Sequence, residues 1–340
     1  MCSRIVWKGR NGKPVIVGRN MDWFEDMKTN LWIFPAGIER DGLTAVNPLK
    51  WTSKYGSLVA TAYDLGAADG MNEKRLDGNA LFLSESSYGG RDEDLPGLTL
   101  SLWLQFYLDN FSTVEEAISY TEKHPYQLRP TTAGLAEKKT IRLHLSLSDI
   151  TGDTAIIEYV DGERLVYHDR RYRVMTNSPT YDQQIEGLKR YKGFGGTSDL
   201  PGSAKAADRF VRAAFYLQQL PDDPGSERQA IASVISVMRN ITQPFGISAP
   251  DEPNTSPTRW RTIADLTSGF YYFESTTSPF IIWVDTGKID FCMGSGVRKL
   301  DLADSPDRIG DVTSQFQPAA PYEPLEPDPE ETSVSDTAIA

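Results

Sequence analysis

The chain has 340 residues, of which 39% are hydrophobic and 11% aromatic, so it can bury one large core or the cores of two ordinary domains. Its formal net charge of −12 argues against a nucleic-acid partner, because a phosphate backbone favours basic surfaces. We find neither a membrane-spanning run nor a signal peptide, and therefore expect no membrane insertion and a cytoplasmic protein as the sequence stands. If Met1 replaces a removed leader, the expected compartment is the periplasm.

The predicted strands follow short apolar or alternating runs that are bounded by turn residues. The first two, residues 3–7 and 14–18, flank Asn11 and Gly12 and predict a hairpin. This hairpin brings Cys2 and Arg19 to the same end of a sheet. The other predicted strands are residues 30–34, 58–62, 80–84, 141–147, 155–159, 164–167, 173–176, 270–273 and 280–284.

Helical spacing of apolar residues predicts fewer helices than strands. The predicted helices are residues 98–111, a helix that starts at Val114 after a cap at Ser112 or Thr113, residues 204–220 after a cap at Ser203, and residues 229–238. Strands in blocks and helices in adjacent pairs favour a layered α+β fold over a strict alternation of the two.

The C-terminal end differs in composition from the rest of the chain. The last twenty residues contain six acidic residues and no Lys or Arg, so about half of the net charge is local to this end. Prolines are also frequent from residue 317 onward. We expect a single domain over residues 2–316, followed by a disordered, acidic, proline-rich tail over residues 317–340.

Cysteines and histidines are too few and too widely spaced for a disulfide framework or a zinc site. No nucleotide-binding glycine loop is present, and we expect neither a metal nor a cofactor. We interpret Cys292 as a small buried hydrophobic residue and His124 and His168 as surface residues. His144 falls on the polar face of a predicted strand, and a Cys–His dyad stays open as an alternative.

Cys2 is the candidate nucleophile. Removal of an initiator Met before a small residue leaves Cys2 with a thiol and a free α-amine. A thiol must become a thiolate to attack a carbonyl, and its unperturbed pKa is about 8.5. An α-amine, with a pKa of about 7.7–8.0, can accept that proton near neutral pH and return it later. One residue then serves as nucleophile and base.

Charged residues after the first hairpin can assist this chemistry. A carboxylate at Asp22 can hold or orient the α-amine. Arg19 can lower the pKa of the thiol by stabilising the thiolate. The structural alternative for these two residues is an ordinary ion pair at the surface.

Five segments together resemble the choloylglycine hydrolase family, which contains the bile salt hydrolases and the penicillin V acylases. They occur in the family's order across roughly residues 2–290. Two further segments, residues 30–35 and 84–88, look most like the Gram-negative penicillin V acylase branch, whose members also cleave N-acyl homoserine lactones. The five segments are residues 1–4 (MCSR), 18–23 (GRNMDW), 70–74 (GMNEK), 174–179 (VMTNSP), and 200–203 (LPGS) with 207–212 (ADRFVR).

The resemblance implies a four-layered αββα fold typical of N-terminal nucleophile hydrolases, with two antiparallel sheets between layers of helices, and often a homotetramer. It also implies catalytic roles. Cys2 is the nucleophile and its own base, Asp22 binds the α-amine, and Arg19 tunes the thiol. Arg209 matches the second active-site arginine of the family.

The resemblance further implies how the oxyanion and the substrate are bound. The side-chain amide of Asn177 and the backbone N–H of Phe82 are the expected oxyanion donors. Phe82 stands where bile salt hydrolases usually have Asn, but a backbone donor does not depend on the side chain. Apolar residues within or beside these segments are candidates for a substrate pocket, with a place in the hydrophobic core as the alternative: Met21, Trp23, Phe82, Leu83 and Tyr88. Trp23 is favoured among them, because it resembles an aromatic residue that stacks on the acyl group in this branch.

The sequence therefore predicts a cysteine amidase that cleaves the acyl amide of a small molecule through a thioester on Cys2. Penicillin V and N-acyl homoserine lactones are the leading expected substrates, and conjugated bile salts, cleaved by a bile salt hydrolase, come third. The alternative from another class is a catalytically silent protein that binds an acylated ligand. The joint presence of the five predicted catalytic residues argues against that alternative.

Overall fold

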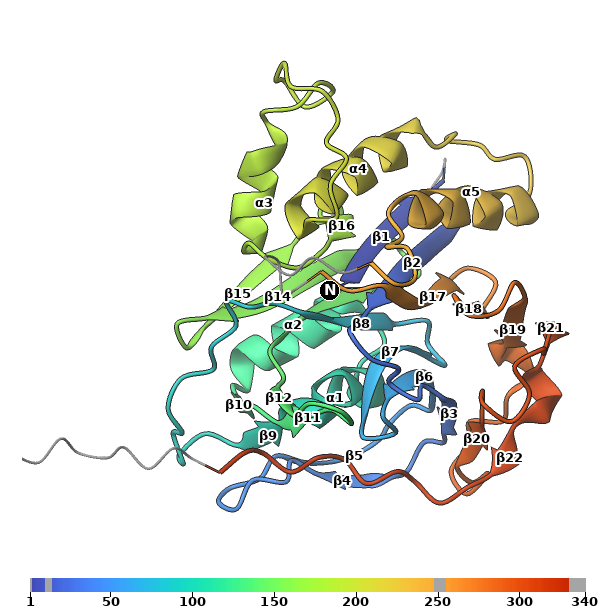
Figure 1. Ribbon diagram of the computed structural model, residues 1–340. Coiled ribbons are helices and arrows are strands. Elements are labelled where there is room, and N and C mark those ends of the chain that lie inside the picture. The colour runs from blue at the N-terminus through green and yellow to red at the C-terminus, as the bar shows by residue number, and fades with distance from the viewer. Residues whose placement is uncertain (1, 10–13, 248–254, 330–340) are drawn as a thin grey trace, which may run out of the picture.

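The computed structural model describes residues 2–9, 14–247 and 255–329 (Figure 1). Two large sheets lie face to face, and a layer of helices covers the outer face of each one. The predicted αββα sandwich is therefore confirmed. The upper helix layer in Figure 1 contains α3 (Tyr181–Leu188), α4 (Ala206–Gln219) and α5 (Glu227–Asn240), and the lower layer contains α1 (Trp103–Asn110) and α2 (Val114–Lys123).

The first sheet has seven strands in the order β16-β1-β2-β17-β18-β19-β21. All its neighbours are antiparallel except the short pair β19 and β21. The helices α4 and α5 pack on its first strands. Its strands are β1 (Cys2–Lys8), β2 (Val15–Asp22), β16 (Val174–Met175), β17 (Thr258–Asp265), β18 (Phe270–Ser275), β19 (Ile281–Asp285) and β21 (Gly310–Asp311).

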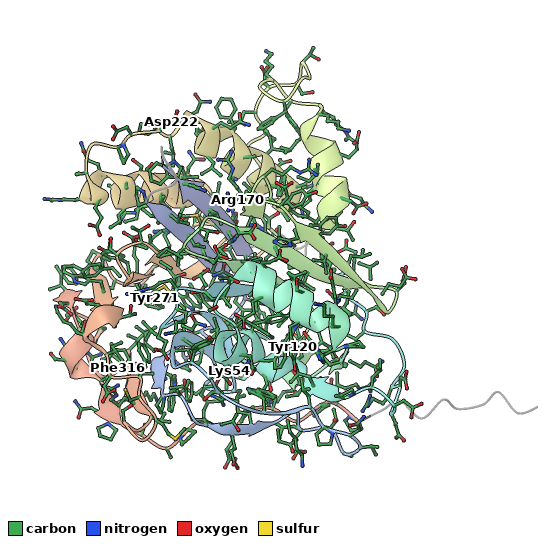
Figure 2. The ribbon with its side chains drawn as sticks, turned by 180° about the vertical axis from the view of Figure 1, so that it is seen from behind. Lys54, Tyr120, Arg170, Asp222, Tyr271 and Phe316 are labelled. Carbon is green, nitrogen blue, oxygen red and sulfur yellow. The ribbon has the colours of Figure 1, made fainter. Side chains whose placement is uncertain are left out.

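The second sheet has nine antiparallel strands in the order β15-β14-β13-β8-β7-β6-β3-β20-β22. Its strands are β3 (Leu31–Phe34), β6 (Ser57–Ala62), β7 (Gly66–Asn72), β8 (Asp77–Phe82), β13 (Leu143–Ser148), β14 (Thr154–Val160), β15 (Glu163–His168), β20 (Arg298–Leu300) and β22 (Gln317–Pro318). Three two-stranded sheets complete the domain: β4 (Glu39–Asp41) with β5 (Lys50–Thr52), β9 (Gly97–Thr99) with β10 (Gln127–Arg129), and β11 (Thr132–Ala133) with β12 (Lys139–Thr140). Figure 2 shows side chains filling the space between these layers.

One face of the β1–β2 hairpin looks toward the second sheet. Cys2 is paired with Met21 across the two strands, and Arg4 is paired with Arg19. Residues that stand opposite each other in an antiparallel pair share a face of the sheet. Arg4 confirms the direction of this face, because its Nη2 donates to Thr154 Oγ1 of the second sheet at 2.9 Å. The thiol of Cys2 and the guanidinium of Arg19 are thus both on the inner face, at the end of the sheet where the hairpin predicts them together.

The other face of the same hairpin looks toward the helices. Ser3 is paired with Asn20, and the Asn20 amide donates to Met238 O of α5 at 2.8 Å. Gly18 lets this helix approach closely, since a Cβ added there would lie 2.8 Å from Met238 Cγ. Alternate residues of β1 and β2 therefore divide between the inner face and the α4–α5 layer.

Two central strands, β7 and β17, were not predicted. Both contain buried charged residues that interrupt the apolar pattern. Asp69 of β7 accepts hydrogen bonds from Tyr271 Oη at 2.5 Å and from Asn79 Nδ2 at 2.9 Å. Arg261 of β17 pairs with Glu274 at 2.7 Å. Because these partners come from elsewhere in the chain, a local pattern does not indicate the strands.

The helix predictions are partly correct. Thr113 caps α2, with its Oγ1 accepting from Glu116 N, as expected. The predicted helix 98–111 is instead divided between β9, a 3-10 turn (Leu100–Leu102) and α1. The predicted cap at Ser203 is wrong, because α4 begins two residues after Ala204 and Ser203 Oγ donates to Asp208 of its first turn. The helix α3 was not predicted.

The predicted disordered tail is wrong for residues 317–329, which pack on the domain. β22 pairs with β20, and the buried Tyr322 ring lies edge-on to Trp32 and Phe34, with centroids 5.5 and 5.4 Å away. An extended proline-rich segment can follow a surface in this way without forming a sheet of its own. Residues 330–340, the rest of that prediction, lie outside the described residues, as does the predicted turn at Asn11 and Gly12. In the described part of the chain, every helix is too short or too polar to cross a bilayer.

Charged groups are buried between the two sheets. Arg19 Nη1 lies 3.6 Å from the Asp69 carboxylate, and Asp77 is buried nearby. Burial raises the pKa of Asp77 well above its ordinary value, and the Asp69 charge adds to the rise while Arg4 opposes it. The ionised form of Asp77 therefore costs folding free energy at neutral pH.

We expect Asp77→Asn to stabilise the protein at neutral pH. A carboxyl group whose pKa is higher when folded binds its proton more strongly in the folded state, so stability falls as pH rises from the unfolded to the folded pKa. The loss is about 1.4 kcal/mol for each unit by which folding raises the pKa. Urea unfolding near about pH 5 and about pH 8 measures this difference, with the exposed Asp307→Asn as control. A variant less stable than the wild type at both values would contradict the prediction.

Candidate active site

The side chain of Cys2 is buried at the start of β1, and its sulfur faces a cation. Arg19 Nη2 donates to Cys2 Sγ at 3.5 Å, and Met21 Sδ lies 3.6 Å from the same sulfur. A guanidinium in this position stabilises negative charge on sulfur. The predicted proximity of Cys2 and Arg19 is thus present in atomic detail.

Three contacts hold the Arg19 side chain in place. Its Nη2 also donates to the carbonyl oxygen of Ala80 on β8 at 2.9 Å. The Asp69 carboxylate is 3.6 Å from Nη1, and the guanidinium lies 4.5 Å from the ring centre of Trp260. Arg19 therefore joins the two sheets beside the sulfur and has little freedom to leave it.

Asn177, two residues after the end of β16, contacts both Cys2 and Phe82. Its Oδ1 accepts from the backbone N–H of Cys2 at 2.6 Å and from Arg209 Nη2 at 3.0 Å. Its Nδ2 donates to the carbonyl oxygen of Phe82 at 2.5 Å. The structure thus brings the two predicted oxyanion residues together beside the nucleophile, although they come from different sheets.

Arg209 of α4 is fully buried and joins the start of β1 to the end of β2. Its Nη1 donates to the carbonyl oxygen of Cys2 at 2.6 Å and to Ser3 Oγ, and it lies 3.5 Å from the Asp22 carboxylate. Asp22 Oδ1 accepts from Thr258 Oγ1 at 2.6 Å. Burial raises the pKa of Asp22, and Arg209 is the strongest of the groups that oppose the rise. Burial likewise lowers the pKa of Arg209, and Asp22 opposes it.

A cavity of about 90 Å³ opens beside Cys2. Three of the predicted substrate residues, Met21, Trp23 and Phe82, line it. The Trp23 Nε1 donates to Tyr63 Oη at 2.7 Å, which fixes the indole against the wall. The other lining residues are mostly apolar, and many are small: Met27, Ala62, Leu65, Gly66, Ala67, Ala68, Ala80, Leu100, Ser101, Thr131, Ala133, Ile141, Leu143 and Leu325.

Tyr88 was expected in this pocket, but the structure places it elsewhere. Tyr88 is not among the residues that line the cavity, and its ring packs on Tyr159 with centroids 5.6 Å apart. Its hydroxyl accepts from Leu143 N at 2.8 Å and donates to Leu143 O at 3.1 Å. The chain turns away after β8, so Tyr88 becomes part of the core next to α1.

His144 and Glu158 form a buried pair behind Asn177, which the sequence analysis missed. His144 Nδ1 lies 2.9 Å from Glu158 Oε1, and Nε2 lies 2.8 Å from the carbonyl oxygen of Thr176. The ring therefore links the Glu158 carboxyl group of β14 to the backbone just before Asn177. Gln184 continues the support, since it accepts from Thr176 Oγ1 at 2.7 Å and donates to the carbonyl of Asn177. His144 was expected on the polar face of its strand, and that face of β13 looks toward the first sheet.

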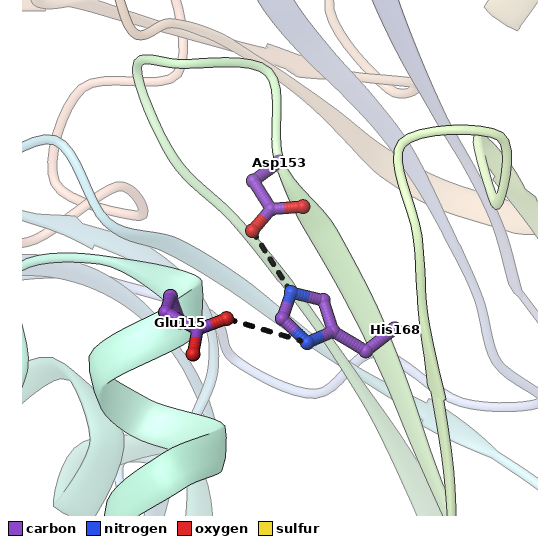
Figure 3. Close-up of side chains that lie close together, drawn as sticks. All are labelled: Glu115, Asp153 and His168. Atoms are coloured by element: carbon purple, nitrogen blue, oxygen red, sulfur yellow. Dashed lines mark hydrogen bonds and ion pairs between the residues drawn. The ribbon is translucent and has the colours of Figure 1, made fainter.

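His168 lies outside the site. Its ring stands between Asp153, at 2.8 Å from Nε2, and Glu115, at 3.9 Å from Nδ1 (Figure 3). In the described part of the chain, these three side chains are the group close enough together to hold a metal ion. The two carboxylates approach different nitrogens of the ring. None of the three lines the cavity beside Cys2.

Cys292 also differs from expectation. It is exposed and unpaired with another cysteine, where a buried residue was predicted. A hydrogen bond to the neighbouring Asp290 carboxylate raises the pKa of its thiol. The two thiols of the chain therefore lie in opposite electrostatic settings, since a cation faces Cys2 and an anion faces Cys292.

A family model described as linear amide C–N hydrolases, choloylglycine hydrolase family, matches residues 2–308. The chain is 42% identical to the penicillin V acylase of Pectobacterium atrosepticum, over 95% of this chain and 91% of that protein. The solved structure of penicillin V acylase from Agrobacterium tumefaciens superposes with a TM-score of 0.86 at 46% identity, covering 95% of this chain and 99% of that one. A bile salt hydrolase/transferase of Clostridium perfringens is 26% identical over 85% of this chain and 93% of that protein.

We expect His144→Leu to lower the free energy of unfolding by about 3–5 kcal/mol, because it leaves the Glu158 carboxylate buried without its partner. The matched control is the exposed His124→Leu, which should change stability by less than about 0.5 kcal/mol. Urea unfolding at neutral pH measures both values. Equal, small changes for the two variants would show that the buried pair does not hold the Asn177 segment.

Proposed function

The chain belongs to the choloylglycine hydrolase family of linear amide C–N hydrolases, and from that premise we propose that Cys2, once it is the first residue of the mature chain, is the nucleophile of a penicillin V acylase-type enzyme. The observation that carries the proposal is the position of the Cys2 sulfur, 3.5 Å from Arg19 Nη2 and on the wall of an apolar cavity. An attacking group, a cation and an acyl site thus meet at one point.

The first half-reaction forms an acyl-enzyme. The free α-amine of Cys2 takes the thiol proton, and the sulfur attacks the carbonyl carbon of the amide. The tetrahedral intermediate collapses as the C–N bond breaks, and the α-ammonium returns the proton to the leaving amine. The acyl group stays on Cys2 as a thioester. Asn177 Oδ1, which lies 2.6 Å from the Cys2 nitrogen, and Asp22 are suited to orient the amine during both proton transfers.

The oxyanion that forms on the substrate requires N–H donors. The Asn177 side-chain amide carries two hydrogens, and one of them donates to the carbonyl oxygen of Phe82. The second hydrogen is proposed to bind the oxyanion, together with the backbone N–H of Phe82. The bond from Arg209 to Asn177 Oδ1 fixes the orientation of the amide, so that Nδ2 and not Oδ1 faces Phe82.

The second half-reaction releases the acid. A water molecule gives a proton to the Cys2 α-amine and attacks the thioester carbonyl. The C–S bond breaks, the acid departs, and the ammonium restores the thiol. Arg19 stabilises the sulfur charge as it leaves the carbon, because it stays within 3.5 Å of the atom.

The cavity favours a compact acyl group. Its volume of about 90 Å³ and its apolar walls suit an aromatic ring or an alkyl chain more than a bulky steroid. Penicillin V, with its phenoxyacetyl chain, and N-acyl homoserine lactones are therefore proposed as substrates ahead of conjugated bile salts. Trp23 is proposed to contact the acyl group, since its ring lies 6.0 Å from that of Phe82 on the cavity wall.

We also propose that the protein is a homotetramer, as the resemblance to the family implies. Light scattering measures the mass of the assembly in solution.

The silent-binder alternative is less well supported. A protein that only binds an acyl ligand does not need a cation beside a buried thiol, nor an asparagine amide between the thiol's backbone and a second sheet. Burying Asp22 and Arg209 together costs desolvation free energy, which a pure binding site has no reason to require.

We expect Cys2→Ala to abolish hydrolysis of penicillin V, because the variant has no sulfur to carry the acyl group. Cys292→Ala is the matched control and should keep wild-type activity, since Cys292 is exposed and does not line the cavity beside Cys2. Release of 6-aminopenicillanic acid measures the rate, and an intact mass establishes that Cys2 is the first residue. Activity that survives Cys2→Ala would rule out the proposed nucleophile.

We expect kcat/KM for penicillin V to exceed that for glycocholate by at least about tenfold, because each poorly accommodated methylene changes binding by roughly 1–3 kcal/mol. A panel of penicillin V, penicillin G, acyl homoserine lactones and glycocholate measures the preference. A preference for glycocholate would contradict the compact pocket and support a bile salt hydrolase.

A further inference from the structure

The C-terminal segment, residues 319–329, follows the domain surface toward the acyl cavity, along the lower edge of the molecule in Figure 1. We propose that this segment is part of the substrate site and that Leu325 is the residue that limits the length of the acyl group. The inference rests on the proposed function, because it assigns the far wall of the same acyl pocket.

Leu325 lines the cavity that Cys2 lines, although 323 positions separate the two residues in the chain. Its carbonyl oxygen accepts from Thr99 Oγ1 at 2.7 Å and from Ser101 Oγ at 2.9 Å. Two hydroxyls on one carbonyl fix the backbone at this point. The backbone of Leu325 is therefore held at the cavity wall.

Contacts on both sides hold the segment against the domain. Before Leu325, the Tyr322 ring is buried edge-on against Trp32 and Phe34. After it, Asp328 N donates to the carbonyl oxygen of Pro130 at 2.9 Å, and the Asp328 carboxylate accepts from Thr132 Oγ1 at 2.8 Å. A segment anchored at three points acts as a fixed wall in place of a loose tail.

Leu325 and Cys2 belong to different parts of the cavity. Cys2 belongs to the first sheet, whereas Leu325 is bonded to Ser101, in the turn that leads into α1 beyond the second sheet. Gly66, which also lines the cavity, lies at the start of β7 and close to Ser101, because a Cβ added to it would be 2.8 Å from Ser101 O. Gly66 and Leu325 both lie next to Ser101, so the proposed acyl chain, extending along the cavity from a thioester on Cys2 to this end, is limited by Leu325.

The chemistry of the wall sets the expected specificity. Near this end the cavity is lined by small residues, including Gly66, Ala67 and Ala68, so a leucine side chain is a large obstacle there. A smaller side chain at position 325 makes the apolar cavity longer, and a larger side chain makes it shorter. One methylene in such a pocket changes kcat/KM by roughly 10–200-fold.

The test compares the full-length wild type with Leu325→Ala and Leu325→Trp. We expect Leu325→Ala to raise the ratio of kcat/KM for dodecanoyl over butanoyl homoserine lactone by about tenfold or more, and Leu325→Trp to lower it by a similar factor. Glu326→Ala is the matched control, because its side chain is the exposed neighbour on the same segment. It should leave the ratio within about twofold of the wild-type value.

A binding measurement separates failure of this inference from failure of the proposed function. Dissociation constants for the free acids, butanoate and dodecanoate, are measured by calorimetry on the same variants and need no catalysis. If the wild type hydrolyses no acyl amide, the proposed function fails, and the acid affinities still decide the role of Leu325. Ratios and affinities that do not change in Leu325→Ala and Leu325→Trp, with circular dichroism unaltered, would overturn the inference. Leu325→Val provides a milder change in the same direction if Leu325→Ala unfolds.

Discussion

The whole site depends on the register in which β1 pairs with β2. Pairing of Cys2 with Met21 puts the thiol on the inner face, beside Arg19. The same pairing puts Ser3 and Asp22 on the face that Arg209 reaches from α4. A slip of one residue would turn the thiol toward the helices and the carboxylate away from them. One hairpin register therefore separates the attacking atom from the groups that orient its backbone.

The register is itself held by buried charges that are costly to place in a core. Arg209 and Asp22 are fully buried. Burial lowers the pKa of Arg209 and raises the pKa of Asp22, so it favours the neutral form of each group. Removing one member of such a pair destabilises the fold more than replacing both members by apolar residues, because the remaining charge is buried without a partner. The pair therefore makes the arrangement around Cys2 specific, at a cost that the apolar cores on either side of the second sheet must offset.

The proximity of Cys2 and Arg19 was predictable from local sequence, because short apolar runs indicate β1 and β2. The roles of Asp22, Asn177 and Arg209 were implied by the resemblance to the family. What could not be predicted depends on partners far away in the chain. β17 carries Arg261, whose guanidinium pairs with Glu274 on the next strand, so the sequence of β17 does not resemble a buried strand. His144 stands on an inner face that local alternation suggested was polar. Leu325 follows a stretch of prolines and acids whose composition is that of a disordered tail, yet distant hydroxyls fix its backbone.

The central claim, that Cys2 forms a thioester while it is the first residue of the chain, is tested most directly by trapping the intermediate. The enzyme is mixed with penicillin V, quenched with acid during steady turnover, digested, and examined by mass spectrometry. The account predicts a phenoxyacetyl group on the peptide that begins with Cys2, when the sample is kept acidic throughout so that the acyl group stays on the sulfur and does not move to the α-amine. An acyl group on any other residue, or a mature chain in which another residue still precedes Cys2 during turnover, would contradict it.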